Sequence, residues 1–102
     1  MTKSELIERT SLKLPHLMQR DVELAINVII DAMIHHLARG ERIEIRGFGG
    51  FSVIQRAARI GRNPKTGEQV SLPIRHTTHF KAGLDLRERV TLSNDRFPLI
   101  RD

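Results

Sequence analysis

The sequence contains no cysteine, tryptophan or tyrosine, and its only aromatic residues are four phenylalanines. The lack of cysteine excludes a disulfide framework, a cysteine-ligated zinc site and a thiol nucleophile, and it favours the cytoplasm over an oxidising compartment. No apolar run approaches the length of a membrane span, and the opening Met-Thr-Lys-Ser-Glu does not resemble a secretory signal. We therefore expect one small cytoplasmic domain that does not enter a membrane.

Acidic residues are nearly absent from one segment of the chain. Lys and Arg number 17 and Asp and Glu 12 among the 102 residues, so the formal net charge is +5. Residues 54–81 hold six of the cations but only one carboxylate, Glu68, so the whole excess of positive charge lies in this segment. Such a segment favours a nucleic acid as the partner. An anionic membrane is a weaker alternative, because the segment lacks an apolar face.

The first 40 residues predict two helices. Thr2 to Glu5 has the T-x-x-E form of a capping box, and the first helix is expected to end before Pro15. The second is expected over about Met18–Ala38, with Gly40 as its stop. Its polar residues form one narrow stripe, and apolar residues cover most of the remaining surface. So short a chain cannot cover this helix alone, so we expect a dimer core that includes Val22, Ile26, Ile29, Ile30 and Met33.

The rest of the chain predicts strands and one more helix, and therefore an α+β fold. A strand is expected over Arg42–Arg46 with Ile43 and Ile45 inward, and it is followed by a glycine-rich turn over Gly47–Phe51. The next strand, about Phe51–Ala58, begins a hairpin that returns through Val70–Leu72 and Ile74–Phe80. We assign Phe48, Phe51 and Phe80 to the dimer core and expect the last helix over about Ala82–Val90. Residues 55–75, approximately, have almost nothing to bury and are expected to project as an arm.

No catalytic motif is apparent. The spacing of Gly61 and Gly67 resembles that of a phosphate-binding loop, but Glu68-Gln69 follows where Lys-Ser/Thr is required. The pairs His35-His36 and His76-x-x-His79 lack the neighbouring ligands of a metal site. We therefore expect no enzyme activity, no metal and no cofactor.

The turn at the end of the basic hairpin is the most informative motif. It reads Gly-Arg-Asn-Pro-Lys-Thr-Gly over residues 61–67. Pro64 fits two interpretations: it shapes the turn, or it acts as an apolar wedge that unstacks base pairs from the minor groove. The residues alone do not separate these interpretations.

The chain resembles the HU and integration host factor family of bacterial DNA-bending proteins over residues 1–90. The resemblance is strongest in GERIEIRGFGGF (40–51) and RAARIGRNPKTG (56–67), and HFKAG (79–83) also matches. This family is itself a standard example of minor-groove architectural binding. The opening MTKSELIER and the ERIEIRGFG strand are most similar to the beta subunit of integration host factor.

The resemblance implies an intertwined dimer with a helical base, a short antiparallel sheet and one protruding β-ribbon arm per subunit. Pro64 would intercalate at each arm tip, and Glu44 would orient Arg46. The resemblance implies a nucleoid-associated bacterial protein that bends double-stranded DNA in recombination, replication and transcription. The other expected DNA-binding residues are Lys3, Ser4, Arg42, Arg46, Arg56, Arg59, Arg62, Asn63, Lys65, Arg75, Lys81 and the amides of Ala82 and Gly83.

The partner subunit and the sequence preference stay open. A beta-like chain implies a heterodimer with an alpha-like subunit of integration host factor, although a homodimer is possible. The alternative function is that of an HU-like protein with little sequence preference for DNA or RNA, or of a translational regulator.

The chain departs from the family pattern at Thr78, at Leu84 and in its tail. Thr78 replaces a common proline and is expected to loosen the end of its strand. Leu84 replaces a common lysine, which removes one expected phosphate contact. The segment 91–102 is longer than usual, and we expect its Phe97, Leu99 and Ile100 to pack across the dimer base.

Overall fold

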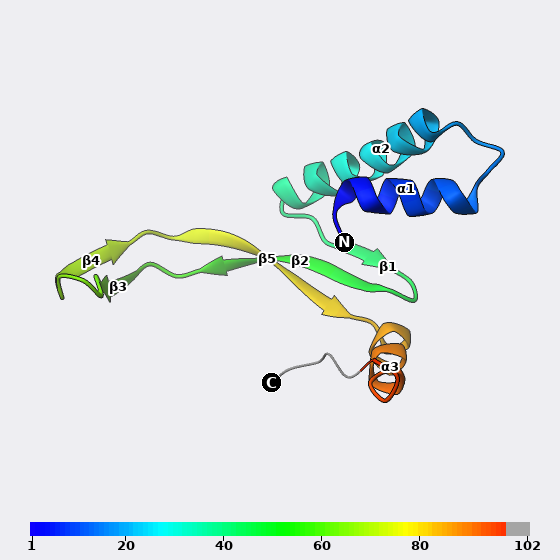
Figure 1. Ribbon diagram of the computed structural model, residues 1–102. Helices are drawn as coiled ribbons and strands as arrows, with labels where there is room; N and C mark the ends of the chain where they lie inside the picture. Colours follow the sequence, from blue (N-terminus) through cyan, green and yellow to red (C-terminus); the bar gives the residue numbers. More distant parts are fainter. Residues whose placement is uncertain (98–102) are drawn as a thin grey trace.

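The computed structural model describes residues 1–97 of the chain. The element order is α1 (Lys3–Lys13), α2 (Gln19–Ala38), β1 (Ile43–Ile45), β2 (Gly49–Arg56), β3 (Arg59–Arg62), β4 (Gln69–Leu72), β5 (Arg75–Ala82) and α3 (Leu84–Ser93). The predicted α+β class is confirmed. In Figure 1, α1 and α2 form a helical hairpin beside the sheet, α3 lies apart from them, and a long ribbon extends away from all three helices.

Helix α1 begins and ends as the sequence predicted. The Thr2 hydroxyl accepts a hydrogen bond from the Glu5 amide at 3.2 Å, which caps the first turn. The helix ends at Lys13, two residues before Pro15. Each of the two N-terminal helices contributes one buried apolar residue, Ile7 from α1 and Val22 from α2. These two residues mark the packing of α1 against α2.

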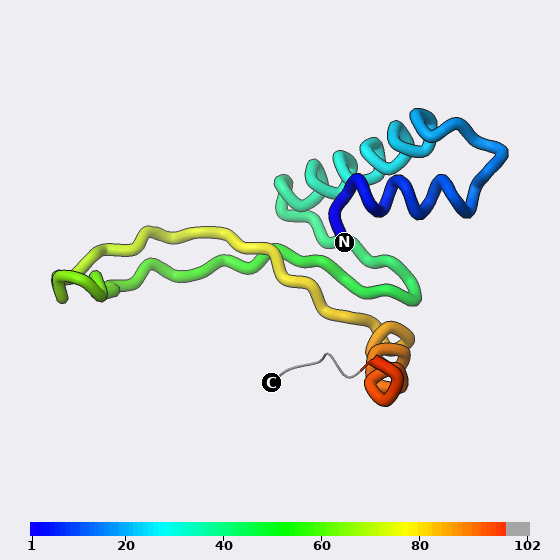
Figure 2. The backbone as a smooth tube through the Cα atoms, viewed as in Figure 1, coloured from blue at the N-terminus to red at the C-terminus, as the bar shows by residue number. Residues whose placement is uncertain are grey.

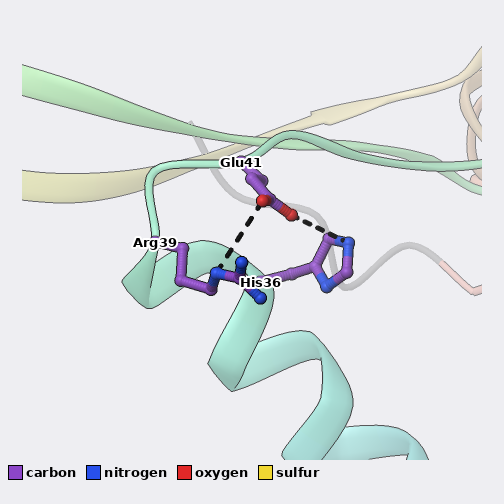
Figure 3. Close-up of polar contacts among 3 residues, drawn as sticks. All are labelled: His36, Arg39 and Glu41. Carbon is purple, nitrogen blue, oxygen red and sulfur yellow. Dashed lines mark ion pairs between the residues drawn. The ribbon is translucent and has the colours of Figure 1, made fainter.

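Helix α2 ends in a turn that ties it to the first strand. The Gly40 amide donates to Leu37 and the Glu41 amide to His36, both at 3.0 Å, which is the Schellman pattern with Gly40 at a φ of 78°. The Glu41 carboxylate lies 3.0 Å from His36 Nε2 and 3.8 Å from Arg39 Nε (Figure 3). The three side chains are about half exposed or more, so these ion pairs contribute at most about 1 kcal/mol.

The strands form two antiparallel sheets, and the chain passes from the larger sheet into the smaller one and back. The larger has the order β1-β2-β5, and the smaller pairs β3 with β4. The expected strand over Phe51–Ala58 is wrong at both ends, because β2 starts at Gly49 and ends at Arg56. Strand β5 pairs with β2 residue for residue from Arg75 to Ala82. Thr78 is paired with Val53 in this ladder, and its expected loosening of the strand end stays a prediction.

Helix α3 lies two to three residues further along the chain than expected. Ala82 is the last residue of β5, so the helix starts at Leu84, and it continues to Ser93 rather than ending at Val90. Within the described part of the tail, Phe97 is 60% exposed and Arg96 lies over its ring at 5.7 Å. The expected packing of Phe97 across a dimer base stays a prediction, and Leu99 and Ile100 lie outside the described residues.

The molecule is too extended to be a self-sufficient globule. Its radius of gyration is 19.1 Å, whereas a compact domain of this length has about 13 Å. The tube in Figure 2 shows that the ribbon of β3 and β4 and the helix α3 lie at separate extremities. Among residues 1–97, no helix has the length and apolar character needed to cross a membrane.

Candidate nucleic-acid interface

The register of the larger sheet separates a basic face from an apolar face. Side chains that are paired across strands, or two residues apart along one strand, share a face. Glu44 pairs with Gly50, Gly50 with Lys81, and Arg56 with Arg75. We call this side the basic face; its charged members are Arg42, Glu44, Arg46, Arg56, Arg75 and Lys81.

The opposite face of the sheet carries the phenylalanines. Phe51 pairs with Phe80, and their ring centroids are 4.7 Å apart, while Phe48 lies 5.0 Å from Phe80. Phe48 is nevertheless 42% exposed and Phe80 37% exposed. Ile45, expected to point inward, is 39% exposed. The apolar face is therefore assembled but only partly covered by the chain itself.

An open hollow lies on the basic face where β1, β5 and the start of α3 meet. Its volume is about 580 Å³. Its lining brings together four cations from three elements: Arg42, Arg46, Lys81 and Arg87. Arg42 Nη2 lies 2.8 Å from Glu44 Oε1. Glu44 thus holds Arg42, and the expectation that it would orient Arg46 is not met.

Gly83 also lines this hollow, but its amide is used within the chain. Its N–H donates to the Phe48 carbonyl at 2.9 Å, so it is already satisfied within the chain. The phosphate contact expected from this amide stays a prediction. Ala82, the other residue of the expected amide pair, lines the hollow as the last residue of β5.

A second hollow lies at the root of the arm. Its volume is about 660 Å³, and Arg56, Arg59 and Arg75 line it together with Leu72 and Pro73. Arg56 and Arg75 are direct cross-strand partners. Like charges in such positions destabilise a sheet in the absence of an anion. The arrangement is typical of a surface that binds a polyanion.

The tip of the arm is a turn held by its own hydrogen bonds. The Asn63 side-chain oxygen accepts from the Lys65 amide at 2.9 Å, and the Asn63 carbonyl accepts from the Gly67 amide at 2.7 Å. Arg62 Nη1 donates to the Gly67 carbonyl at 3.1 Å. Pro64 is exposed at the outer end of this turn. Arg62 and Asn63, which we expected to contact DNA, thus also shape the turn that presents Pro64.

The two site residues at the start of the chain lie apart from both hollows. Lys3 and Ser4 form the first turn of α1, where both are exposed. The Ser4 hydroxyl lies 3.1 Å from the Thr2 hydroxyl. Neither residue lines the hollows described above.

The expected dimer core is divided between the interior and the surface of one subunit. Val22 is 3% exposed and is already buried within the chain, so it does not need a partner. Ile26, Ile30 and Met33 are half-buried, whereas Ile29 is 59% exposed. Further large apolar side chains of α2 stay exposed, namely Leu24, Val28 and Ile34.

Sequence reasoning missed two residues of the basic surface, His79 and Arg87. His79 shares the basic face because it lies two residues from Lys81 and is paired with Ser52. The period of two along residues 75–81 could have found it. His76, three residues away, lies on the opposite face, so these two histidines do not converge on a metal. Among residues 1–97 no group of three potential ligands is close enough to hold one.

A helical hairpin, a sheet with one basic face and a β-ribbon arm define a β-ribbon nucleic-acid-binding protein. Residues 1–91 match the family described as Bacterial DNA-binding protein. The chain is 57% identical over 99 residues to integration host factor subunit beta of Halorhodospira halophila, which covers 97% of each chain. It is 61% identical over 90 residues to the same subunit of Pseudoalteromonas atlantica, covering 88% of this chain and 94% of the other.

Solved structures agree with the sequence comparisons. The HU protein of an Anabaena HU–DNA cocrystal superposes with a TM-score of 0.80 at 31% identity, covering 88% of this chain and 97% of that one. An HU variant from Thermotoga maritima gives a TM-score of 0.62 at 31% identity, covering 88% and 99%. The chain belongs to the HU and integration host factor family of bacterial DNA-binding proteins.

Proposed function

We propose that this chain is one subunit of an architectural protein that binds the minor groove of duplex DNA and bends it sharply. In this role it organises the bacterial nucleoid and supports recombination, replication and transcription complexes. The observation that carries the proposal is a pair of hollows rich in cations, one beside β1 and one at the root of a projecting arm. The role requires no catalytic group, metal or cofactor.

The two hollows supply the phosphate contacts in this proposal. Arg42, Arg46 and Lys81 converge in the first, and Arg56, Arg59 and Arg75 in the second. Phosphates between Arg56 and Arg75 would relieve the repulsion of these paired cations, so binding also stabilises the root of the arm. Lys65, Lys3, Ser4 and Ala82 would add contacts at the arm tip and along the flanks.

Pro64 is the proposed wedge. The hydrogen bonds of Asn63 and Arg62 close the turn behind it, so the ring is presented on a defined support rather than on a loose loop. A defined support is needed because unstacking a base step costs a few kcal/mol of free energy. A proline on a mobile loop would not offset this cost. The function of Asn63 and Arg62 is then to position Pro64 as well as to contact the backbone of DNA.

The proposed partner is an alpha-like subunit of integration host factor. Relatives at 57% and 61% identity carry the name of the beta subunit, and a beta subunit requires a partner of the other kind. Residues 1–90 would form the DNA-binding domain, and the tail 91–102 would extend it at the dimer base. Purification of the native complex and measurement of the subunit masses would identify the partner.

Pro64→Ala tests the bending function. In the purified dimer we expect the energy transfer between dyes at the two ends of a duplex to fall, because the unstacked step closes. The affinity should change by less than about tenfold, since the cationic contacts persist. Pro73→Ala is the matched control, because this second arm proline lies at the root and not at the tip. A bend unchanged by Pro64→Ala would contradict the wedge, and equal binding to a hairpin RNA would favour the HU-like alternative.

A further inference from the structure

His79 is a titratable side chain on a surface otherwise built from permanent charges. Along β5 the residues on the basic face are Arg75, Thr77, His79 and Lys81, and the register partner of His79 on β2 is Ser52. His79 is exposed, so a partner that covers the sheet meets the imidazole directly. The other strand histidine, His76, is paired with Gln55 and lies on the apolar face.

The charged groups that share the basic face with His79, or border it, are mostly cations. Its own strand contributes Arg75 and Lys81, and β2 contributes Arg56. The segment of β1 contributes Arg42, Arg46 and the carboxylate of Glu44, which is engaged by Arg42 at 2.8 Å. Helix α3 contributes Arg87 at the hollow and Asp85, whose Oδ2 lies 4.0 Å from the place of a Cβ on Gly47. The Glu44 carboxylate is paired with Arg42, and the Asp85 carboxylate lies near the Gly47 turn. Cations therefore outnumber carboxylates on this face.

We propose that His79 takes up a proton when DNA binds, so that the affinity for DNA rises as the pH falls through neutrality. This inference rests on the proposed function, because it is the phosphate backbone that supplies the missing negative charge. Imidazole changes charge between about pH 5 and pH 8, whereas the arginines and lysines of this face stay charged. A phosphate beside the ring favours the imidazolium form, and both ring nitrogens then donate hydrogen bonds.

The sign of the effect follows from linkage. If the complex binds more protons than the free partners, the association constant decreases as the pH rises, by at most about tenfold per pH unit for one proton. The affinity is therefore compared between about pH 5 and pH 8, the range over which imidazoles in general change charge. The remaining histidines, His16, His35 and His36, lie before or within α2 rather than on the sheet.

Two measurements on the full-length dimer test the proposal. The first is the dissociation constant for a labelled duplex with kinked or nicked steps, measured by fluorescence anisotropy across this pH range at constant ionic strength. The second is calorimetric titration in buffers of low and high ionisation enthalpy, which counts the protons taken up on binding. We expect a three- to tenfold weaker complex at the upper pH, together with net proton uptake.

Three variants locate the proton. His79→Asn should remove the pH dependence and leave the complex near its high-pH affinity, whereas His79→Arg should hold it near its low-pH affinity throughout. His76→Asn is the matched control on the opposite face of the same strand and should keep the full pH dependence. Retention of the pH dependence by both His79 variants, or pH-independent binding by the unmodified dimer, would overturn the inference while leaving the proposed function standing. Failure to bind the duplex at any pH would overturn both.

Discussion

At Gly49 the sheet leaves no room for a side chain. A Cβ at this position would lie 2.5 Å from the Lys81 carbonyl oxygen and 2.6 Å from Cζ of Phe80. The sequence indicated a glycine-rich turn and phenylalanine anchors here, but not that one glycine allows the Phe80 ring to lie against the backbone. Only the cross-strand register brings these residues together.

Gly49→Ala should therefore destabilise the protein strongly. We expect the free energy of unfolding, measured by urea denaturation at fixed protein concentration, to fall by about 2–3 kcal/mol, because backbone or ring atoms must shift. Gly50→Ala is the matched control: its Cβ would lie 3.5 Å from the end of the Arg42 side chain, and we expect a change below about 1 kcal/mol. Equal effects of the two substitutions would contradict this account of Gly49.

Residues that the sequence marked as DNA contacts have structural partners as well. Arg62 and Asn63 hold the tip turn, Glu44 holds Arg42, and the Gly83 amide binds the Phe48 carbonyl. The sequence identified these residues as candidates for contact with DNA. It could not reveal these pairings, because each depends on a side-chain or backbone direction set by the fold.

At the scale of elements, the arm is a separate unit of structure. Residues 57–74 are exposed except for Gly61 and Leu72, which lie against each other across the β3–β4 ribbon. Its root is a direct pair, Arg56 with Arg75. The arm was predictable from the lack of apolar residues, and the break in its returning strand was predicted at Pro73. The break in the outgoing strand was not predicted, because Ala57 and Ala58 do not disfavour a strand strongly.

Replacing residues 57–74 by Asn-Gly should preserve the fold and remove tight DNA binding. The two residues can close a type I′ turn between Arg56 and Arg75, so the larger sheet keeps its hairpin. We expect the thermal midpoint to stay within a few degrees of the original, because the arm buries almost nothing outside itself. The affinity should fall steeply, and the slope of log affinity against log salt should become shallower by about 0.9 for each phosphate that the protein no longer neutralises. Undiminished affinity would show that the arm is not the binding surface.

At the scale of the whole molecule, one subunit leaves too much apolar surface uncovered. The buried apolar residues of the described chain are Ile7 and Val22, whereas α2 exposes Leu24, Val28 and Ile29 by 59% or more. No residue of α3 is buried. Burial at about 25 cal/mol per Å² is the main favourable term in folding, so the folded subunit requires a partner.

The thermal midpoint should accordingly depend on protein concentration. We expect it to rise by a few degrees for each tenfold increase, because unfolding is coupled to dissociation of the dimer. Ile29→Glu, which places a charge on the exposed side of α2, should lower the midpoint and shift the mass measured by light scattering towards the monomer. A midpoint independent of concentration would contradict an obligate dimer.

The sequence by itself determined the elements of this protein and the location of its charge. Capping residues, glycine and proline stops and the period of apolar residues are local signals, so α1, α2 and the arm were predicted close to their observed bounds. Tertiary structure decided which residues share a face, so that His79 lies on the basic face and His76 on the opposite one. It also decided which residues are covered within one subunit, as Val22 is. These outcomes depend on strand register and helix contact, which pair residues far apart in the chain and leave no local pattern in the sequence.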